Sequence, residues 1–325
     1  MLGYRNPEQT GVLGRGWGLI IHSLNVFRSY PSFLLPLLAV WAVYVPSVLY
    51  LRYGYRWDAH GLQRDLAVVF LFIFGLSFLI LMSCAVVLDM IRQIETGEPS
   101  LSRAVGKAFG QDLFKVLPLA IVWAVVWFLL TLIEAVFSKS DHEDNEALTA
   151  QHAAETIANY RNFSFSSAFI EALQKGVRMV VFLIMPAIVW ENLPFYDATK
   201  KGLAVLRAHL SDFGAGYALT YAAAAVVFLP PAIVLEVGTG RHGNPPLVHF
   251  PGSVWVGTII YIGMAWSFTI YLEQMFMAQL YLWHMKWEES ASRAKLTHQP
   301  LPTFSDVARP ELLAKTPGLF APSTI

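Results

Sequence analysis

Six long apolar runs constrain this chain more than any other feature of its sequence. They cover about residues 32–51, 67–90, 116–137, 172–190, 213–235 and 254–283. A helix of about 20 predominantly apolar residues is long enough to cross a bilayer. The third run, VLPLAIVWAVVWFLLTLIEAVF, is too long and too uniformly apolar for a typical core helix of a soluble protein. The runs predict an all-α polytopic membrane bundle of six transmembrane helices.

The composition agrees with this prediction. Hydrophobic residues make up 55% of the chain and charged residues only 14%, whereas soluble domains carry about 25% charged residues. The formal net charge is zero, so no overall field favours nucleic acid as a partner. The single cysteine, Cys84, lies in an apolar run and cannot build a disulfide framework or a cysteine metal site. The fourth run is the weakest, because its span must include Lys175 and Arg178.

Lysine and arginine in the flanks predict the orientation of the bundle. With a cytoplasmic N-terminus, fifteen of the 23 lysines and arginines fall inside and the other eight fall outside. The positive-inside rule therefore favours both termini in the cytoplasm. We expect an N-terminal amphipathic segment at 1–30, a transmembrane domain at 31–287 with an acidic external loop at 138–166, and a polar cytoplasmic tail at 288–325.

The segments outside the spans have distinct characters. In the N-terminal segment, an apolar set at helical spacing indicates a helix lying on the membrane surface, although the same pattern suits a helix packed on protein. This set comprises Trp17, Ile20, Ile21, Leu24 and Phe27. The external loop carries His142 and His152 near carboxylates, but their spacing matches no metal signature. The proline-containing tail is expected to be extended or disordered unless a partner orders it.

One pattern occurs twice along the chain, in VVLDMIRQIETGEPSLSRAVGKAF and in IVWENLPFYDATKKGLAVLRAHL. In each, a span ends in a carboxylate, a proline starts a basic helix, and that helix leads into the next span. The apolar faces expected are Leu101, Val105 and Ala108 in the first helix, and Phe195, Ala198, Gly202, Leu206 and Leu210 in the second. Arg103, Lys107, Lys200, Lys201 and Arg207 are expected to contact lipid headgroups. The repetition suggests two related halves, a plan common among transporters.

These segments, together with GRGWGLIIHSLNVFRSYPSFLLPLL, resemble an uncharacterised family of bacterial six-helix membrane proteins. That family is similar in layout to the membrane domain attached to some glycerophosphodiester phosphodiesterases. The matching residues are Trp17, Ser23, Pro31, Pro36, Gly97, Pro99, Pro186, Glu191, Pro194, Asp197 and Ala198. The resemblance implies the fold and a location in the bacterial inner membrane, and it implies no activity.

No familiar catalytic motif occurs in the sequence. GxSxG, Walker and HExxH patterns are absent, and His209 and His284 lie near the predicted cytoplasmic ends rather than at span centres, which argues against haem. We therefore expect no catalytic residue, cofactor or metal. Charged residues within the spans form two candidate clusters. The outer cluster comprises Glu134, Glu171, Lys175 and Arg178, with Glu134 pairing to Arg178 or Lys175. The cytoplasmic cluster comprises Asp89, Glu191 and Glu273.

The cytoplasmic acids allow two interpretations. They could together bind a cation or gate a pore, or each could be neutralised by a nearby base. The candidate bases are Arg92, three residues after Asp89, and Lys107, Lys200, Lys201 and Arg207 on the same side of the membrane. The hypothesis that follows from local neutralisation is a non-enzymatic scaffold, assembly factor or accessory subunit. Its partners would be membrane lipids and a second copy or another membrane protein. The alternative is a transporter or channel for a small solute, ion or lipid.

Overall fold

Helices account for nearly all of the computed structural model, which describes residues 11–57, 61–140, 165–239, 248, 250–314 and 319–320. No strand occurs within these ranges. The main helices are α1 (Val12–Ser29), α2 (Leu35–Leu49), α3 (Leu62–Thr96), α4 (Leu101–Lys107), α5 (Leu113–Ser140), α7 (Phe165–Val189), α8 (Phe195–Ala208), α9 (Leu210–Thr239) and α10 (Gly252–Leu296). Short 3-10 segments are η2 (Pro31–Leu34), η6 (Phe304–Asp306) and η7 (Leu312–Ala314), and π-helical turns are η3 (Tyr50–Gly54) and η5 (Ala108–Asp112).

Six of these helical stretches are long and apolar enough to cross a membrane, as predicted. They are Pro31–Gly54, Leu62–Thr96, Leu101–Ile133, Ile170–Val189, Leu210–Thr239 and Gly252–Leu296. The fourth includes both Lys175 and Arg178, as its length requires. The chain is thus an all-α multi-pass membrane protein.

The compact units of the fold are not the two sequential halves that the repeated pattern suggests. One unit combines residues 1–38, 90–100 and 204–325, and the other combines 39–89 and 101–203. Three helices, α2, α3 and α8, each pass from one unit into the other. The halves are mixed because a long continuous helix can contribute its two ends to different cores.

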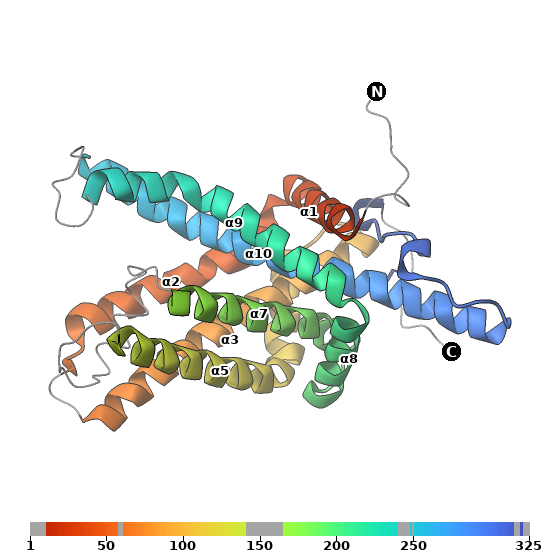
Figure 1. Ribbon diagram of the computed structural model, residues 1–325, viewed down its shortest axis with the longest axis horizontal. Helices are drawn as coiled ribbons and strands as arrows, with labels where there is room; N and C mark the ends of the chain where they lie inside the picture. The colour runs from red at the N-terminus through yellow and green to blue at the C-terminus, as the bar shows by residue number, and fades with distance from the viewer. Residues whose placement is uncertain are drawn as a thin grey trace. The chain divides into compact units, whose positions relative to one another are not determined.

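The first unit is built on α9 and α10, which lie side by side with α1 packed against them (Figure 1). A small residue makes the close approach of α9 to α10 feasible, because a Cβ at Gly216 would collide with the ring of Phe276. Polar contacts then join α10 to α1. The Tyr271 hydroxyl donates to the Ser23 carbonyl at 3.1 Å, and Gln279 Nε2 donates to Ser23 Oγ at 2.7 Å.

The buried face of α1 differs from the predicted one. It consists of Gly16, Leu19, Ile20, Ser23 and Val26, and it packs on α9 and α10. Three of the residues expected on a single apolar face remain outside it, namely Trp17 (54% exposed), Ile21 (42%) and Leu24 (38%). The helix therefore has two apolar faces, one used for packing on protein and one left exposed. Periodicity alone merged these two faces, since they are adjacent around the helix.

The last helix is longer than expected and changes character along its length. The last apolar run was expected to cover about 254–283, and α10 continues to Leu296 with 45 residues, which corresponds to about 68 Å. A hydrocarbon core is only about 30 Å thick, so a large part of α10 must lie outside it. Exposed Val256, Ile259 and Ile260 occupy the first part, whereas charged residues occur from Lys286 onward. The end after Trp283 is therefore the one that projects into water.

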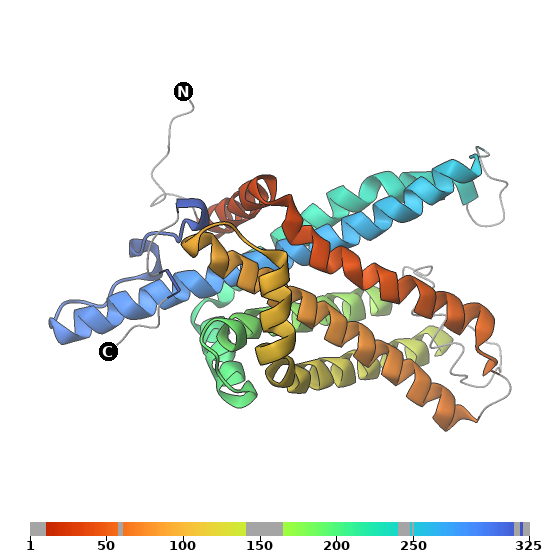
Figure 2. The ribbon, with the colours of Figure 1, turned by 180° about the vertical axis from the view of Figure 1, so that it is seen from behind.

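The C-terminal tail is extended, as expected, but it packs on its own chain instead of needing a separate partner. In the described residues, Leu312, Leu319 and Phe320 are buried. The backbone N–H of Leu312 donates to His22 Nε2 on α1, and that of Leu319 donates to Glu95 near the end of α3. Figure 2 shows the end of the chain beside α1 and α10. The few apolar residues of the tail attach it to the protein. The mostly polar composition of the tail did not predict this role.

The second unit contains most of α2, the first 28 residues of α3, and α4, α5 and α7. Its helices pack through aromatic rings and small residues. Trp123 of α5 meets Phe182 of α7 edge to face, and Phe70 of α3 meets Phe128 of α5 in the same way. Figure 1 shows α5 and α7 running side by side. Aromatic pairs of this kind add about 0.5–1.5 kcal/mol beyond the burial of their area.

The two basic helices bury faces that differ in part from the predicted ones. In α4 and the π-helical turn that follows, Ala104 and Ala108 are buried, while Val105 is 38% exposed. In α8, Ala198, Gly202 and Val205 are buried. Leu210 lies beyond the end of α8, begins α9, and is exposed. Small residues form the contacts in both helices because the short basic helices lie close to neighbouring backbone. At Gly202, for example, a Cβ atom would lie 3.1 Å from the Cα atom of Ile184.

Candidate functional site

The most organised polar arrangement in the second unit joins the ends of α3 and α7 to the two basic helices. Asp89 lies near the end of the apolar part of α3, and its side chain is only 6% exposed. Lys107, the last residue of α4, places Nζ 2.5 Å from the Asp89 carboxylate. The same ammonium group lies 3.5 Å from the carbonyl oxygen of Val189, at the C-terminus of α7. A cation is stabilised there by both the carboxylate and the negative end of the helix dipole.

A second ion pair repeats this arrangement in the other copy of the pattern. Glu191 follows the end of α7, and Lys201 of α8 places Nζ 2.6 Å from its carboxylate. The turn between them contains Asn192 in the left-handed region, with φ of 58°. Asparagine tolerates this conformation better than most residues. Its side-chain oxygen accepts a hydrogen bond from Lys115 of α5. Each carboxylate that ends a span is thus bound to a lysine of the helix that follows.

The two copies also brace each other. The indole N–H of Trp190 donates to the carbonyl oxygen of Leu88, the residue before Asp89, at 2.9 Å. In the opposite direction, Lys107 of the first copy approaches Val189 of the second. Val189 is the last residue of α7, so its carbonyl has no partner within the helix and is satisfied by such a contact. We call the contacts among Asp89, Lys107, Trp190, Glu191 and Lys201 the carboxylate lock.

The structure therefore brings two of the three predicted cytoplasmic acids together in one arrangement, and each has the local base that the neutralisation hypothesis requires. For Asp89 one such base is Lys107, which lies 18 residues later in the chain. Arg92 is therefore not the only base available to Asp89. Glu273 belongs to the first unit. It is fully buried on α10, next to Gln274, which is also fully buried. A buried carboxylate on a membrane helix is costly and is often functional.

The candidate outer cluster is described only in part. The side chain of Glu134 lies outside the described residues, as do His142, His152 and the acidic loop. The pairing of Glu134 with Arg178 or Lys175 remains a prediction. Lys175 is buried, Glu171 is half-buried, and Arg178 lines a small cleft between α5 and α7 with Trp123 and Trp127.

The five basic residues proposed to contact headgroups divide into two groups. Lys107 and Lys201 form the ion pairs of the carboxylate lock. Arg103, Lys200 and Arg207 are exposed. Only these three have side chains directed to solvent in a way that suits anionic headgroups, so the lipid contact proposed for the basic helices depends on them.

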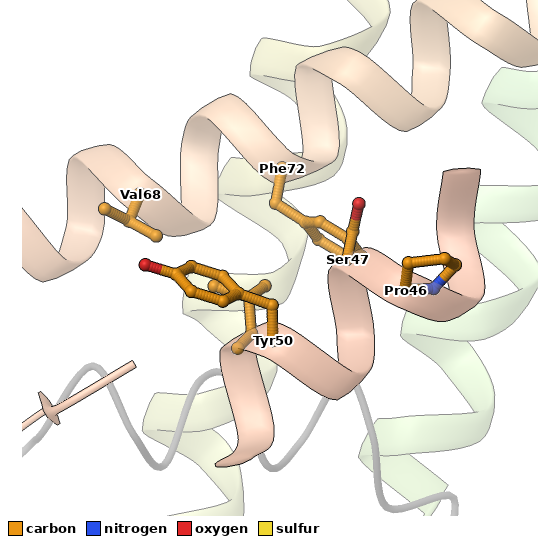
Figure 3. Close-up of a pocket in the computed structure, with 6 residues that line it drawn as sticks. Pro46, Ser47, Tyr50, Val68 and Phe72 are labelled. Carbon is orange, nitrogen blue, oxygen red and sulfur yellow. The ribbon is translucent and has the colours of Figure 1, made fainter. Parts of the chain in front are cut away.

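A shallow groove lies between the end of α2 and α3 in the second unit. Figure 3 shows Tyr50 lying toward Val68 and Phe72, with Pro46 and Ser47 along the other side. The Ser47 hydroxyl already donates to the Val43 carbonyl one turn earlier. The groove is lined mainly by apolar atoms within a candidate span. It is suited to a lipid chain, not to a polar substrate.

One cluster in the first unit was not predicted. His209, between α8 and α9, places Nε2 2.9 Å from Nδ1 of His284 on α10. Phe304 of the tail lies against the His209 ring, with ring centroids 3.7 Å apart, and against Trp283 at 4.2 Å. Burial, and next the nearby His284, lower the pKa of His209 to about 4. The two histidines are 75 residues apart, and only their shared position near the predicted cytoplasmic ends of two spans could have suggested the contact.

A further ion pair fixes α1 close to this cluster. Arg15 Nε lies 2.9 Å from the carboxylate of Asp212, three residues after His209. Among the described residues, no group of three or more His, Cys, Asp or Glu side chains is arranged to hold a metal ion. Comparisons of the chain with family models, with curated proteins and with solved structures found no match.

Proposed function

We propose that this protein is a non-enzymatic scaffold, assembly factor or accessory subunit of the bacterial inner membrane. The observation that carries the proposal is the carboxylate lock. Two acids at matching positions in the repeated pattern, where a transporter could bind its coupling ion, are each held by a lysine of the following helix. Such pairs fasten the basic helices to the ends of the spans and give a rigid base on one side of the membrane.

The proposed orientation, with both termini in the cytoplasm, has support from two sides. The tail contacts α1 through Leu312 and His22, which requires the two ends of the chain to lie on the same side of the membrane. An even number of spans meets that requirement. The distribution of lysine and arginine then favours the cytoplasm. The resemblance to bacterial six-helix membrane proteins also agrees with an inner-membrane location.

Membrane lipids are the first partners in this proposal. The exposed stripe of α1 comprises Leu13, Trp17, Ile21 and Leu24, spaced by four, four and three residues. A stripe of this spacing that includes tryptophan suits the headgroup boundary. The adjacent buried face of α1 packs on α9 and α10, so α1 would join the protein to the lipid surface. A second copy or another membrane protein is the further partner class.

Transport of a small solute, ion or lipid is the alternative function, and one observation favours it. Glu273 is fully buried on α10 together with the polar side chains of Gln274 and Gln279. Buried ionisable residues within membrane helices often mark ion pathways. If Glu273 served a pathway, substituting it would change flux, whereas substitutions in the carboxylate lock would change stability alone.

The test compares the Asp89→Asn and Glu191→Gln variants with the wild type, each purified in detergent or reconstituted into proteoliposomes. We expect Asp89→Asn to destabilise by roughly 1–3 kcal/mol, because it leaves a lysine with no carboxylate in a mostly buried position. Glu191→Gln should cost about 1 kcal/mol or less, because that pair is more exposed. Thermal and chemical unfolding measure both values. Neither variant should alter any dependence of stability on cations.

The matched control is Lys200→Gln, which removes an exposed neighbour of Lys201 and should change stability by no more than about 0.5 kcal/mol. If Glu191→Gln kept the full stability of the wild type but lost cation-dependent stabilisation or flux, the scaffold role would be refuted and transport would replace it.

A further inference from the structure

The C-terminal tail binds to the first unit in the manner of a peptide ligand. It leaves the end of α10, reverses, and returns along that helix, so that Pro302 lies at Trp287 and Val307 lies at Trp283. Pro302 and Phe304 are partly buried, whereas Thr303, Ser305 and Asp306 are exposed. Phe304–Asp306 form the 3-10 turn η6, and the residues on either side of it, Thr303 and Val307, are extended.

Two tryptophans of α10 hold the main chain of this segment. The indole N–H of Trp287 donates to the carbonyl oxygen of Pro302 at 3.0 Å, and that of Trp283 donates to the carbonyl oxygen of Val307 at 2.9 Å. The tryptophans are one helical turn apart, and they form the Trp283–Trp287 ridge. The two carbonyls flank the 3-10 turn η6 (Phe304–Asp306), so the ridge holds the main chain on both sides of that turn. Hydrogen bonds to carbonyls recognise the backbone without requiring particular side chains.

One side chain supplies the selectivity of the contact. The ring of Phe304 lies between those of His209 and Trp283, at centroid distances of 3.7 Å and 4.2 Å. His284 and Trp287 complete the cluster, since each of these rings is also within 6.0 Å of the His209 ring. An aromatic residue two positions after Pro302 is therefore the one side chain that this part of the surface encloses.

The contact continues beyond the ridge to α1. The guanidinium group of Arg309 lies 5.7 Å from the centre of the Trp283 ring, in the range of a cation–π interaction. It also occupies the space next to Gly18, where a Cβ would collide with it. Leu312 then donates its N–H to His22 and buries its side chain. The ligand segment therefore extends from Pro302 to Leu312 and is held at both ends.

We propose that the Trp283–Trp287 ridge is a binding site for a protein segment that places an aromatic side chain in a 3-10 turn between two carbonyl oxygens held by the ridge, and that the protein's own tail is its resident ligand. A partner protein with a segment of this chemistry would displace the tail. This inference rests on the proposed function, because it gives the chemistry by which the scaffold recognises its partner. The tail is the template, since every feature named in the ligand is one that the surface contacts.

The experiment measures binding of a fluorescein-labelled synthetic peptide of residues 299–313 by fluorescence anisotropy. The full-length Phe304→Ala chain should bind it at least about tenfold more tightly than the wild type. The intact tail competes in the wild type at an effective concentration in the millimolar range, and loss of the Phe304 ring weakens that competition. In the Phe304→Ala chain, Trp287→Phe should weaken peptide binding by roughly threefold to tenfold, because one hydrogen bond is lost.

Trp255→Phe is the matched control, since Trp255 is on the same helix but contacts Phe250 and Gly238 instead of the tail. It should leave peptide binding unchanged. A chain ending at Gln299 is a second receptor, should Phe304→Ala disturb folding. The proposal is overturned if neither receptor binds the peptide saturably, or if Trp287→Phe and Trp255→Phe have the same effect. The peptide is the chain's own, so this result does not depend on whether a cellular partner exists. Failure to find any partner would count against the scaffold role alone.

Discussion

Each ion pair in the carboxylate lock depends on a base that is distant in sequence but close in space. Lys107 contacts Asp89 although it lies 18 residues later in the chain, because α4 returns toward α3. The lysine position is favourable for a second reason, namely that the Val189 carbonyl lies at the negative end of α7. Sequence proximity indicated that a base would be available, and the path of the chain determined which one it is.

His209 makes the docking of the tail sensitive to pH. Burial and the neighbouring His284 lower its pKa from 6.5 to about 4, while Asp212 acts in the opposite direction and Arg15 in the same one. When the tail is released or the protein unfolds, the pKa returns toward 6.5. The released state then binds more protons between these values. Stability of the docked state is therefore complete above pH 6.5 and falls as the pH is lowered toward 4.

We expect the melting temperature to fall over this interval, together with protection of the tail from proteolysis. Burial also lowers the pKa of His22, which accepts a hydrogen bond from Leu312, so it contributes in the same direction. The double variant His209→Asn and His22→Asn should show a clearly weaker pH dependence. A wild-type melting temperature that stayed level from pH 7 to pH 4.5 would contradict the assignment.

Among the helices, the contact between α9 and α10 depends on one small residue. Gly216 faces the buried ring of Phe276, and this ring occupies the space that a Cβ would need. Gly214 is on the same helix, with nothing within 4 Å of its Cβ position. The two glycines therefore form a matched pair, one required by packing and one replaceable.

Gly216→Ala should destabilise the protein by roughly 1–3 kcal/mol, as overpacking does in cores. Gly214→Ala should be neutral or stabilising by up to about 1 kcal/mol, because alanine is the better helix former. Chemical unfolding of the two variants in the same detergent compares them directly. Equal effects of both substitutions would mean that the close approach of α9 to α10 is not limiting.

The whole molecule is best tested through its topology. Cysteine introduced at Ser305, an exposed residue of the docked tail, should be inaccessible to an impermeant thiol reagent in intact cells and should react after lysis. Cysteine at Asp144, in the predicted external loop outside the described residues, should react in intact cells. The native Cys84 is buried and serves as the background control. Labelling of Ser305→Cys from outside would reverse the proposed orientation.

The sequence was sufficient for the class of fold and the number of spans, because a membrane helix must satisfy its own backbone and expose apolar side chains over about 20 residues. That is a local requirement, and composition records it directly. The acids and bases at the span ends were also recognisable as a group, since charged residues are rare within apolar runs.

The tertiary structure decided which of these residues meet. The direct contact of Lys107 with Asp89, the pairing of His209 with His284 over 75 residues, and the attachment of the tail to α10 depend on the return path of the chain. The division of α1 into a packed face and an exposed face had the same origin, because both faces are apolar and hydropathy does not distinguish lipid from protein as the neighbour. Periodicity identifies a face that avoids water, and only packing determines what covers it.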